Sequence, residues 1–70
     1  MWAKDGRRSW TYSDGSVQGR AAVHEMEGGY KAVVEITDKD FGMDLVSKEE
    51  FFQSEQEAMA FVREAMEEAV

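Results

Sequence analysis

The sequence predicts an α+β domain: an antiparallel four-stranded meander (ββββα) with one C-terminal helix packed on one face. Three observations predict it. Turn-forming residue pairs divide the first 50 residues into β-prone runs, these runs gather their apolar side chains on one face, and residues 54–70 carry apolar side chains at helical spacing. The chain has 70 residues, no linker-like stretch and no internal repeat, so a single domain over 1–70 is expected.

Turn signals separate four expected strands, at about residues 8–13, 17–26, 30–37 and 41–46. Asp14-Gly15 and Gly28-Gly29 are two-residue hairpin signals, because the favoured hairpin turns need positive φ angles. Asp38-Lys39 is a weaker third signal. Together they predict three consecutive hairpins.

The registers of these hairpins agree with one another. Turns at the three signals pair Tyr12 with Val17, Val23 with Val34, and Val34 with Met43. Directly paired residues share a face, and a slip by one residue would mix the faces. The predicted apolar face consists of Trp10, Tyr12, Val17, Ala21, Val23, Ala32, Val34, Ile36, Phe41, Met43 and Leu45.

The C-terminal segment has the signature of a helix. Ser54 and Glu57 form a capping box, and the apolar residues that follow recur every three or four positions. The predicted stripe comprises Ala58, Met59, Val62, Ala65, Met66 and Ala69, with Phe61 and Val70 at its edges. Residues 47–53 fit an earlier capping box formed by Ser47 and Glu50, a strand continued to Phe52, or a short irregular link that places Phe52 in the core. The link is preferred.

Composition excludes several functional classes. The chain has a net charge of −7, no Cys and one His, which excludes a thiol nucleophile, a disulfide scaffold and a two-His metal site. The N-terminus carries charge without an apolar segment behind it, so we expect no signal peptide. No apolar run approaches the roughly 18 residues of a membrane span. We therefore expect a cytoplasmic protein, in the host cytoplasm if phage-encoded, with no membrane partner, no cofactor and no metal.

The charge is unevenly distributed. Residues 1–24 carry a net charge of +2, and residues 25–70 carry −9. Such acidity either only solubilises the chain or marks a face that binds a protein with a basic surface, whereas nucleic acid is not the expected partner. The candidate partner-binding acids are Glu35, Asp38, Asp40, Asp44, Glu57, Glu64, Glu67 and Glu68.

Other chemistry-bearing residues have ordinary structural explanations. His24 is expected beside Asp44 across two strands, where a surface pair is favoured over an acid–base pair because no nucleophile accompanies it. Residues 38–44 alternate acids as a calcium loop does, but they lack its length and its closing Glu, so a hairpin turn is favoured. Trp10, Tyr12 and Tyr30 could stack on single-stranded nucleic acid, but Trp10 and Tyr12 fall on the predicted core face, so core packing is favoured. No enzyme is expected.

Two features point to contacts with other chains. Trp2 precedes the first expected strand and has no assigned place in the core, so it is either an exposed anchor for a partner or part of a frayed terminus. The first and last strands of the meander are edges without Pro, which leaves a homodimer open.

The helix start carries a family resemblance. Strands followed by Phe52-Gln53-Ser54-Glu55-Gln56-Glu57-Ala58 resemble the arm-type DNA-binding N-terminal domains of phage integrases, over residues 30–70. The resemblance implies a βββα fold. Those domains read DNA with a basic sheet, whereas Glu35 and Asp44 lie on the expected exposed sheet face here, so only the fold is carried over. In size and acidity the chain also resembles phage-encoded inhibitors such as anti-CRISPR proteins, some of which are DNA mimics.

The resulting hypothesis is a non-enzymatic acidic protein-interaction module. In its sharper form, the chain is a phage or mobile-element inhibitor that blocks a basic nucleic-acid-binding surface of a host protein. The alternatives are a small βββα nucleic-acid-binding domain that uses the basic N-terminal stretch, and a self-associating protein.

Overall fold

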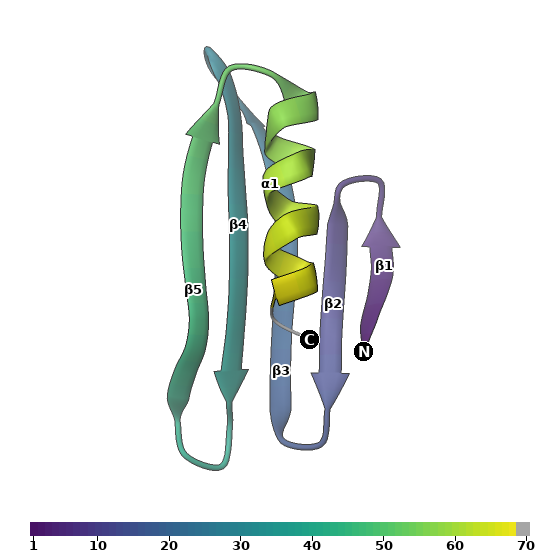
Figure 1. Cartoon of the computed structure of the whole chain (residues 1–70), viewed down its shortest axis with the longest axis vertical. Coiled ribbons are helices and arrows are strands. Elements are labelled where there is room, and N and C mark those ends of the chain that lie inside the picture. Colours follow the sequence, from purple (N-terminus) through teal and green to yellow (C-terminus); the bar gives the residue numbers. More distant parts are fainter. Residues whose placement is uncertain (69–70) are drawn as a thin grey trace.

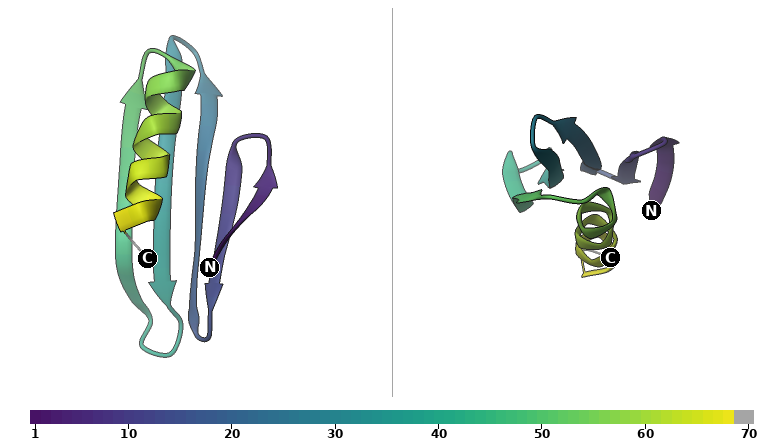
Figure 2. Two further views of the ribbon diagram at one scale, coloured as in Figure 1. Left: turned by 45° about the vertical axis from the view of Figure 1, so that its right-hand side comes forward. Right: turned by 90° about the horizontal axis from the view of Figure 1, so that it is seen from above.

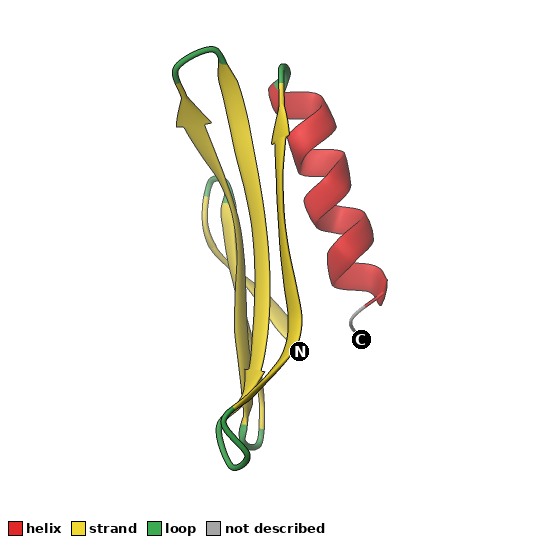
Figure 3. Cartoon of the chain, turned by 90° about the vertical axis from the view of Figure 1, so that its left-hand side faces the viewer, coloured by secondary structure: helices red, strands yellow, loops and turns green. Residues whose placement is uncertain are grey.

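The computed structural model describes residues 1–68 as one antiparallel sheet with a helix on one face (Figures 1 and 3). The strands lie in the sheet in chain order. The elements are β1 (Trp2–Gly6), β2 (Ser9–Asp14), β3 (Val17–Met26), β4 (Gly29–Asp38), β5 (Met43–Phe52) and α1 (Glu55–Glu68). The α+β class and the C-terminal helix are confirmed, but the sheet has five strands rather than the four expected.

The additional strand is β1. It pairs with β2 so that Trp2 lies opposite Tyr12 and Lys4 opposite Trp10, with an irregular register before Gly6. The sequence signal is weak because β1 is short and ends in charged residues and Gly6, and because no Gly occupies the β1–β2 turn. The Trp2 and Tyr12 rings lie 5.2 Å apart, so cross-strand aromatic packing supports a strand that propensity alone does not predict.

The next two hairpins turn one residue away from the expected positions. The β2–β3 turn has Gly15-Ser16 at its centre, and Gly15 alone has a positive φ (62°), the pattern of a type II′ turn. The β3–β4 turn has Glu27-Gly28 at its centre, where Gly28 has a φ of 84°. In each turn the glycine supplies the left-handed conformation that other residues rarely adopt.

These changes shift each pairing by two residues. Tyr12 faces Gly19 rather than Val17, and Val23 faces Ala32 rather than Val34. A two-residue shift leaves every side chain on its original face, because strand side chains alternate with a period of two. The apolar face predicted for β2, β3 and β4 is therefore confirmed, although the individual partners were wrong.

The prediction for β5 was wrong in register. The β4–β5 loop spans residues 39–42 instead of two residues, and a bulge near Leu45 adds one more, so Ile36 pairs with Val46. The odd shift places Val46 and Phe52 on the helix side. Phe41, Met43 and Leu45, expected in the core, are 78%, 55% and 49% exposed.

Residues 47–53 belong mostly to β5 and not to an irregular link. The strand continues to Phe52, which leaves only residues 53 and 54 between it and α1. The expected position of Phe52 is confirmed: it packs against the core, and its ring lies 5.3 Å from that of Phe61.

Helix α1 has the expected cap and the expected buried stripe. The Glu57 backbone N–H donates to Ser54 Oγ at 3.2 Å, and Ala58, Val62 and Ala65 are buried. Met59, Phe61 and Met66 pack beside them. Ala69 and Val70, which the predicted stripe includes, lie outside the described residues.

The cap gives a first prediction. Ser54→Ala should lower the free energy of unfolding by about 1 kcal/mol, because it removes the acceptor for the Glu57 N–H. Urea denaturation followed by circular dichroism measures the loss. Ser54→Asp keeps an acceptor and should retain most of the stability, and equal losses in both variants would contradict the capping role.

The helix covers only part of its sheet face. A 14-residue helix is about 21 Å long, whereas the molecule extends over 38 Å. The helix starts at the end of the sheet where β5 ends and stops short of the β4–β5 loop (Figures 1 and 2). The buried cluster between the layers comprises Ala21, Val23, Ala32, Val34, Ala58, Val62 and Ala65.

Candidate functional site

The structure distributes the predicted acidic residues over three places instead of one face. Glu35 lies on the sheet face away from the helix, between Arg20 and Ser47. Three aspartates, Asp38, Asp40 and Asp44, lie at the β4–β5 loop. Glu57, Glu64, Glu67 and Glu68 lie on α1, which covers the opposite sheet face (Figure 3). One continuous acidic face, as expected from the sequence, is therefore not formed.

The loop aspartates organise the loop itself. Asp38 Oδ1 accepts hydrogen bonds from Ser16 Oγ at 3.2 Å and from the Asp40 N–H at 3.0 Å. Asp44 Oδ1 accepts one from Thr37 Oγ1 at 3.1 Å. These bonds are typical of a turn. Within residues 1–68, no three His, Asp or Glu side chains come together as a cation site would require.

The helix acids separate into two sets. Glu57, Glu64 and Glu68 share a flank with Phe61, and the contact of Phe61 with Phe52 shows that this flank faces β5. Lys48 of β5 confirms the orientation, because its Nζ lies 3.1 Å from Glu68 Oε2. Glu67 lies outside this flank and borders the same surface hollow as Trp2 and Lys4 of β1.

Sequence reasoning missed a fourth acid beside this flank. Glu50 lies opposite Ala32 in the β4–β5 pairing, on the same sheet face as Lys48, and it is exposed. It escaped the prediction because residues 47–53 were expected to be an irregular link, in which no face can be assigned. We call Glu50, Glu57, Glu64 and Glu68 the acidic strip.

The cations of the N-terminal region are dispersed. Arg8 reaches back to the helix start, where its Nη1 lies 3.6 Å from Glu55 Oε2 and its guanidinium carbon 5.9 Å from the centre of the Tyr30 ring. On the other face, Arg20 lies opposite Glu35 in the β3–β4 pairing. Phosphate binding needs clustered cations, and Arg8 and Arg20 lie on opposite faces of the sheet, so this arrangement gives little support to the nucleic-acid-binding alternative.

The expected neighbour of His24 is also different. His24 pairs with Lys31, whereas Asp44 lies opposite Thr37, toward the other end of the sheet. The expectation that His24 and Asp44 are neighbours is therefore wrong. The three aromatic residues considered for stacking on nucleic acid take part in packing within the fold. Trp10 and Tyr30 pack against the core, and Tyr12 packs against Trp2.

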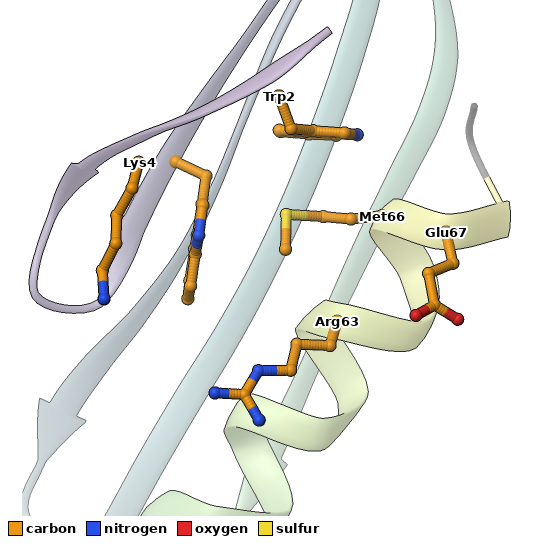
Figure 4. Close-up of a pocket in the computed structure, with 6 residues that line it drawn as sticks. Trp2, Lys4, Arg63, Met66 and Glu67 are labelled. Carbon is orange, nitrogen blue, oxygen red and sulfur yellow. The ribbon is translucent and has the colours of Figure 1, made fainter.

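Trp2 has a place in the fold, which corrects the expectation that it lacks one. It lies in β1, packs against the core, and has a buried Nε1 with no hydrogen-bond acceptor among residues 1–68. Trp2 also lines a cleft of about 640 Å³ between the β1–β2 hairpin and α1 (Figure 4). The cleft is lined by Trp2, Lys4, Trp10, Arg63, Met66 and Glu67. Whether Trp2 anchors a partner stays a prediction.

Within residues 1–68, no helix combines the length and the apolar character needed to span a membrane. Comparisons with protein-family models, with curated proteins and with solved structures found no match for this chain.

Proposed function

We propose that this chain is a non-enzymatic protein-interaction module whose acidic strip binds a basic surface of a partner protein. One observation supports it above the others: Glu57, Glu64 and Glu68 line one flank of a helix that the core holds in place. Glu50 lies on the strand beside them, and Lys48 is the cation paired with this group.

The strip can act electrostatically without any bound group. A row of like charges on a rigid element produces a negative potential that speeds the approach of a positive surface and disfavours nucleic acid. Because a helix rises about 1.5 Å per residue, Glu64 and Glu68 are about 6 Å apart along the axis and Glu57 and Glu64 about 10 Å. The strip thus presents spaced negative charges, which is also what a phosphate backbone presents.

The partner surface that fits this pattern is a nucleic-acid-binding groove. We therefore propose an inhibitor that occupies such a groove as a DNA mimic, a proposal that the resemblance in size and acidity to phage-encoded inhibitors also favours. The partner is defined by chemistry: a protein whose Lys and Arg residues otherwise contact phosphates.

The test is capture followed by competition. The immobilised chain is incubated with a lysate of the cells that carry its gene, or of the host cells if a phage or mobile element carries the gene. Bound protein is then eluted with duplex DNA or with rising salt. We expect release by DNA, and steep weakening between about 50 and 300 mM salt, because screening shortens the reach of exposed charges. Capture that neither DNA nor salt reverses would contradict the proposal.

A charge-reversed variant locates the surface. Glu57→Lys/Glu64→Lys/Glu68→Lys should reduce capture at least tenfold, about 1.4 kcal/mol, while circular dichroism shows an intact fold. A matched control, Asp5→Lys/Glu25→Lys/Glu27→Lys, makes the same change in net charge at exposed positions outside the strip and should retain capture. Equal capture by the folded strip variant would overturn the proposal, and a gel shift of DNA by the unmodified chain at low salt would favour the nucleic-acid-binding alternative.

A further inference from the structure

The cleft beside Trp2 combines apolar and cationic surfaces. Trp2 and Trp10 come from the β1–β2 hairpin, and Met66 comes from α1. Lys4 and Arg63 border the same space from opposite walls, one on β1 and one on the helix. The volume of about 640 Å³ lies within the range of small-molecule sites.

The cleft differs in charge from the rest of the chain. The whole protein carries −7, yet two cations and one acid border this space. Neither Lys4 nor Arg63 has an ion-pair partner within 4.0 Å among residues 1–68. Glu67, one helical turn from Arg63, does not form an ion pair with it either. Both cations are therefore available to an anionic ligand.

The two kinds of surface occupy different parts of the cleft. Figure 4 shows the charged ends of Lys4 and Arg63 toward one end, and the Trp2 ring and the Met66 side chain toward the other. Indole rings and a thioether favour flat, polarisable ligands. Lys and Arg favour a carboxylate, which the guanidinium can bind through two parallel hydrogen bonds.

We propose that this cleft binds a planar aromatic carboxylate, with its ring against Trp2, Trp10 and Met66 and its carboxylate toward Lys4 and Arg63. The site is separate from the acidic strip. It lies on the β1–β2 flank of α1, whereas the strip lies on the β5 flank. The inference is therefore independent of the proposed function and can fail without affecting it.

The test uses 2-naphthoate and its neutral analogue 2-naphthylmethanol as probes. The chain has two Trp residues and both line the cleft, so their two indole N–H resonances in a ¹H–¹⁵N spectrum report directly on its occupancy. We expect 2-naphthoate to shift both resonances saturably at millimolar concentration. The neutral probe should bind at least about fivefold more weakly, because it lacks the charge that meets Lys4 and Arg63.

Two double variants separate site binding from general charge attraction. Lys4→Gln/Arg63→Gln should weaken 2-naphthoate at least about fivefold and leave 2-naphthylmethanol unchanged. Arg7→Gln/Lys39→Gln removes the same charge outside the cleft and should leave both affinities unchanged. The proposal is overturned if 2-naphthoate shifts neither resonance, if the two probes bind equally, or if the two variants weaken binding equally.

Discussion

Val62→Asp is expected to unfold the domain. Val62 is 0% exposed and lies in the middle of the helix stripe, between the two layers. A buried, unpaired carboxylate costs several kcal/mol. A domain of this size has a total stability of only about 4–10 kcal/mol. Little folded protein should therefore remain. The far-UV circular dichroism signal and the amide dispersion in NMR spectra should both be lost.

The control for this variant lies two residues away. Ala60→Asp places the same carboxylate on the exposed side of the same helix and should cost about 0.7 kcal/mol, the difference in helix propensity. Val62→Ala should fall between them, at about 2 kcal/mol, through lost burial and a small cavity. A folded Val62→Asp protein with the stability of Ala60→Asp would show that the helix is not packed as described.

Gly19→Val is expected to cause the second large loss of stability. Gly19 lies on the helix side of β3, opposite Ile36. A Cβ atom here would lie 2.5 Å from the backbone oxygen of Glu35 and 2.8 Å from Ile36 Cγ1. Neither group can move freely, since one is backbone of β4, which pairs with a strand on each side, and the other is a buried side chain. Gly19→Ala should already cost about 1–3 kcal/mol, and Gly19→Val more.

The direction in which Gly19→Ala changes the free energy of unfolding tests this close contact. Glycine in a strand is usually about 0.5–1 kcal/mol less stable than alanine, so Gly→Ala at an open strand position stabilises. At Gly19 the close approach of β4 reverses this sign. Gln18→Ala, on the neighbouring exposed residue, serves as the control for an unrelated change in the strand. Denaturation midpoints measure all three variants, and a Gly19→Ala protein as stable as the parent would contradict the contact geometry.

The predicted strands show which sequence signals are robust. For β2, β3 and β4 the turns were misplaced by one residue, yet the correct face was obtained, because each pairing moved by two. For β5 the same reasoning failed, because the four-residue loop and the bulge near Leu45 together shift the pairing by an odd number. Neither feature has a strong local signal, since Gly42 with a φ of 60° is compatible with several loop lengths.

The candidate site depended on the same β5 register. Glu57, Glu64 and Glu68 could be placed on one helix flank from spacing alone, because the helical period is fixed. The position of β5 was needed to decide which strand that flank faces. It was also needed to place Glu50 and Lys48 beside the flank. Glu67 was grouped with the other helix acids, although in the fold it borders the cleft and lies outside the acidic strip.

The sequence by itself determined the α+β class, the apolar face of the three central elements β2, β3 and β4, the capped helix and its buried stripe. These features follow from local periods of 2 and 3.6 residues and from a capping residue, all of which act within a few positions of the chain. The tertiary structure decided the presence of β1, the register of β5 and the cleft between hairpin and helix. Each of these rests on contacts between distant segments, such as Trp2 with Tyr12 and Phe52 with Phe61, and such packing free energies have no local signature in the sequence.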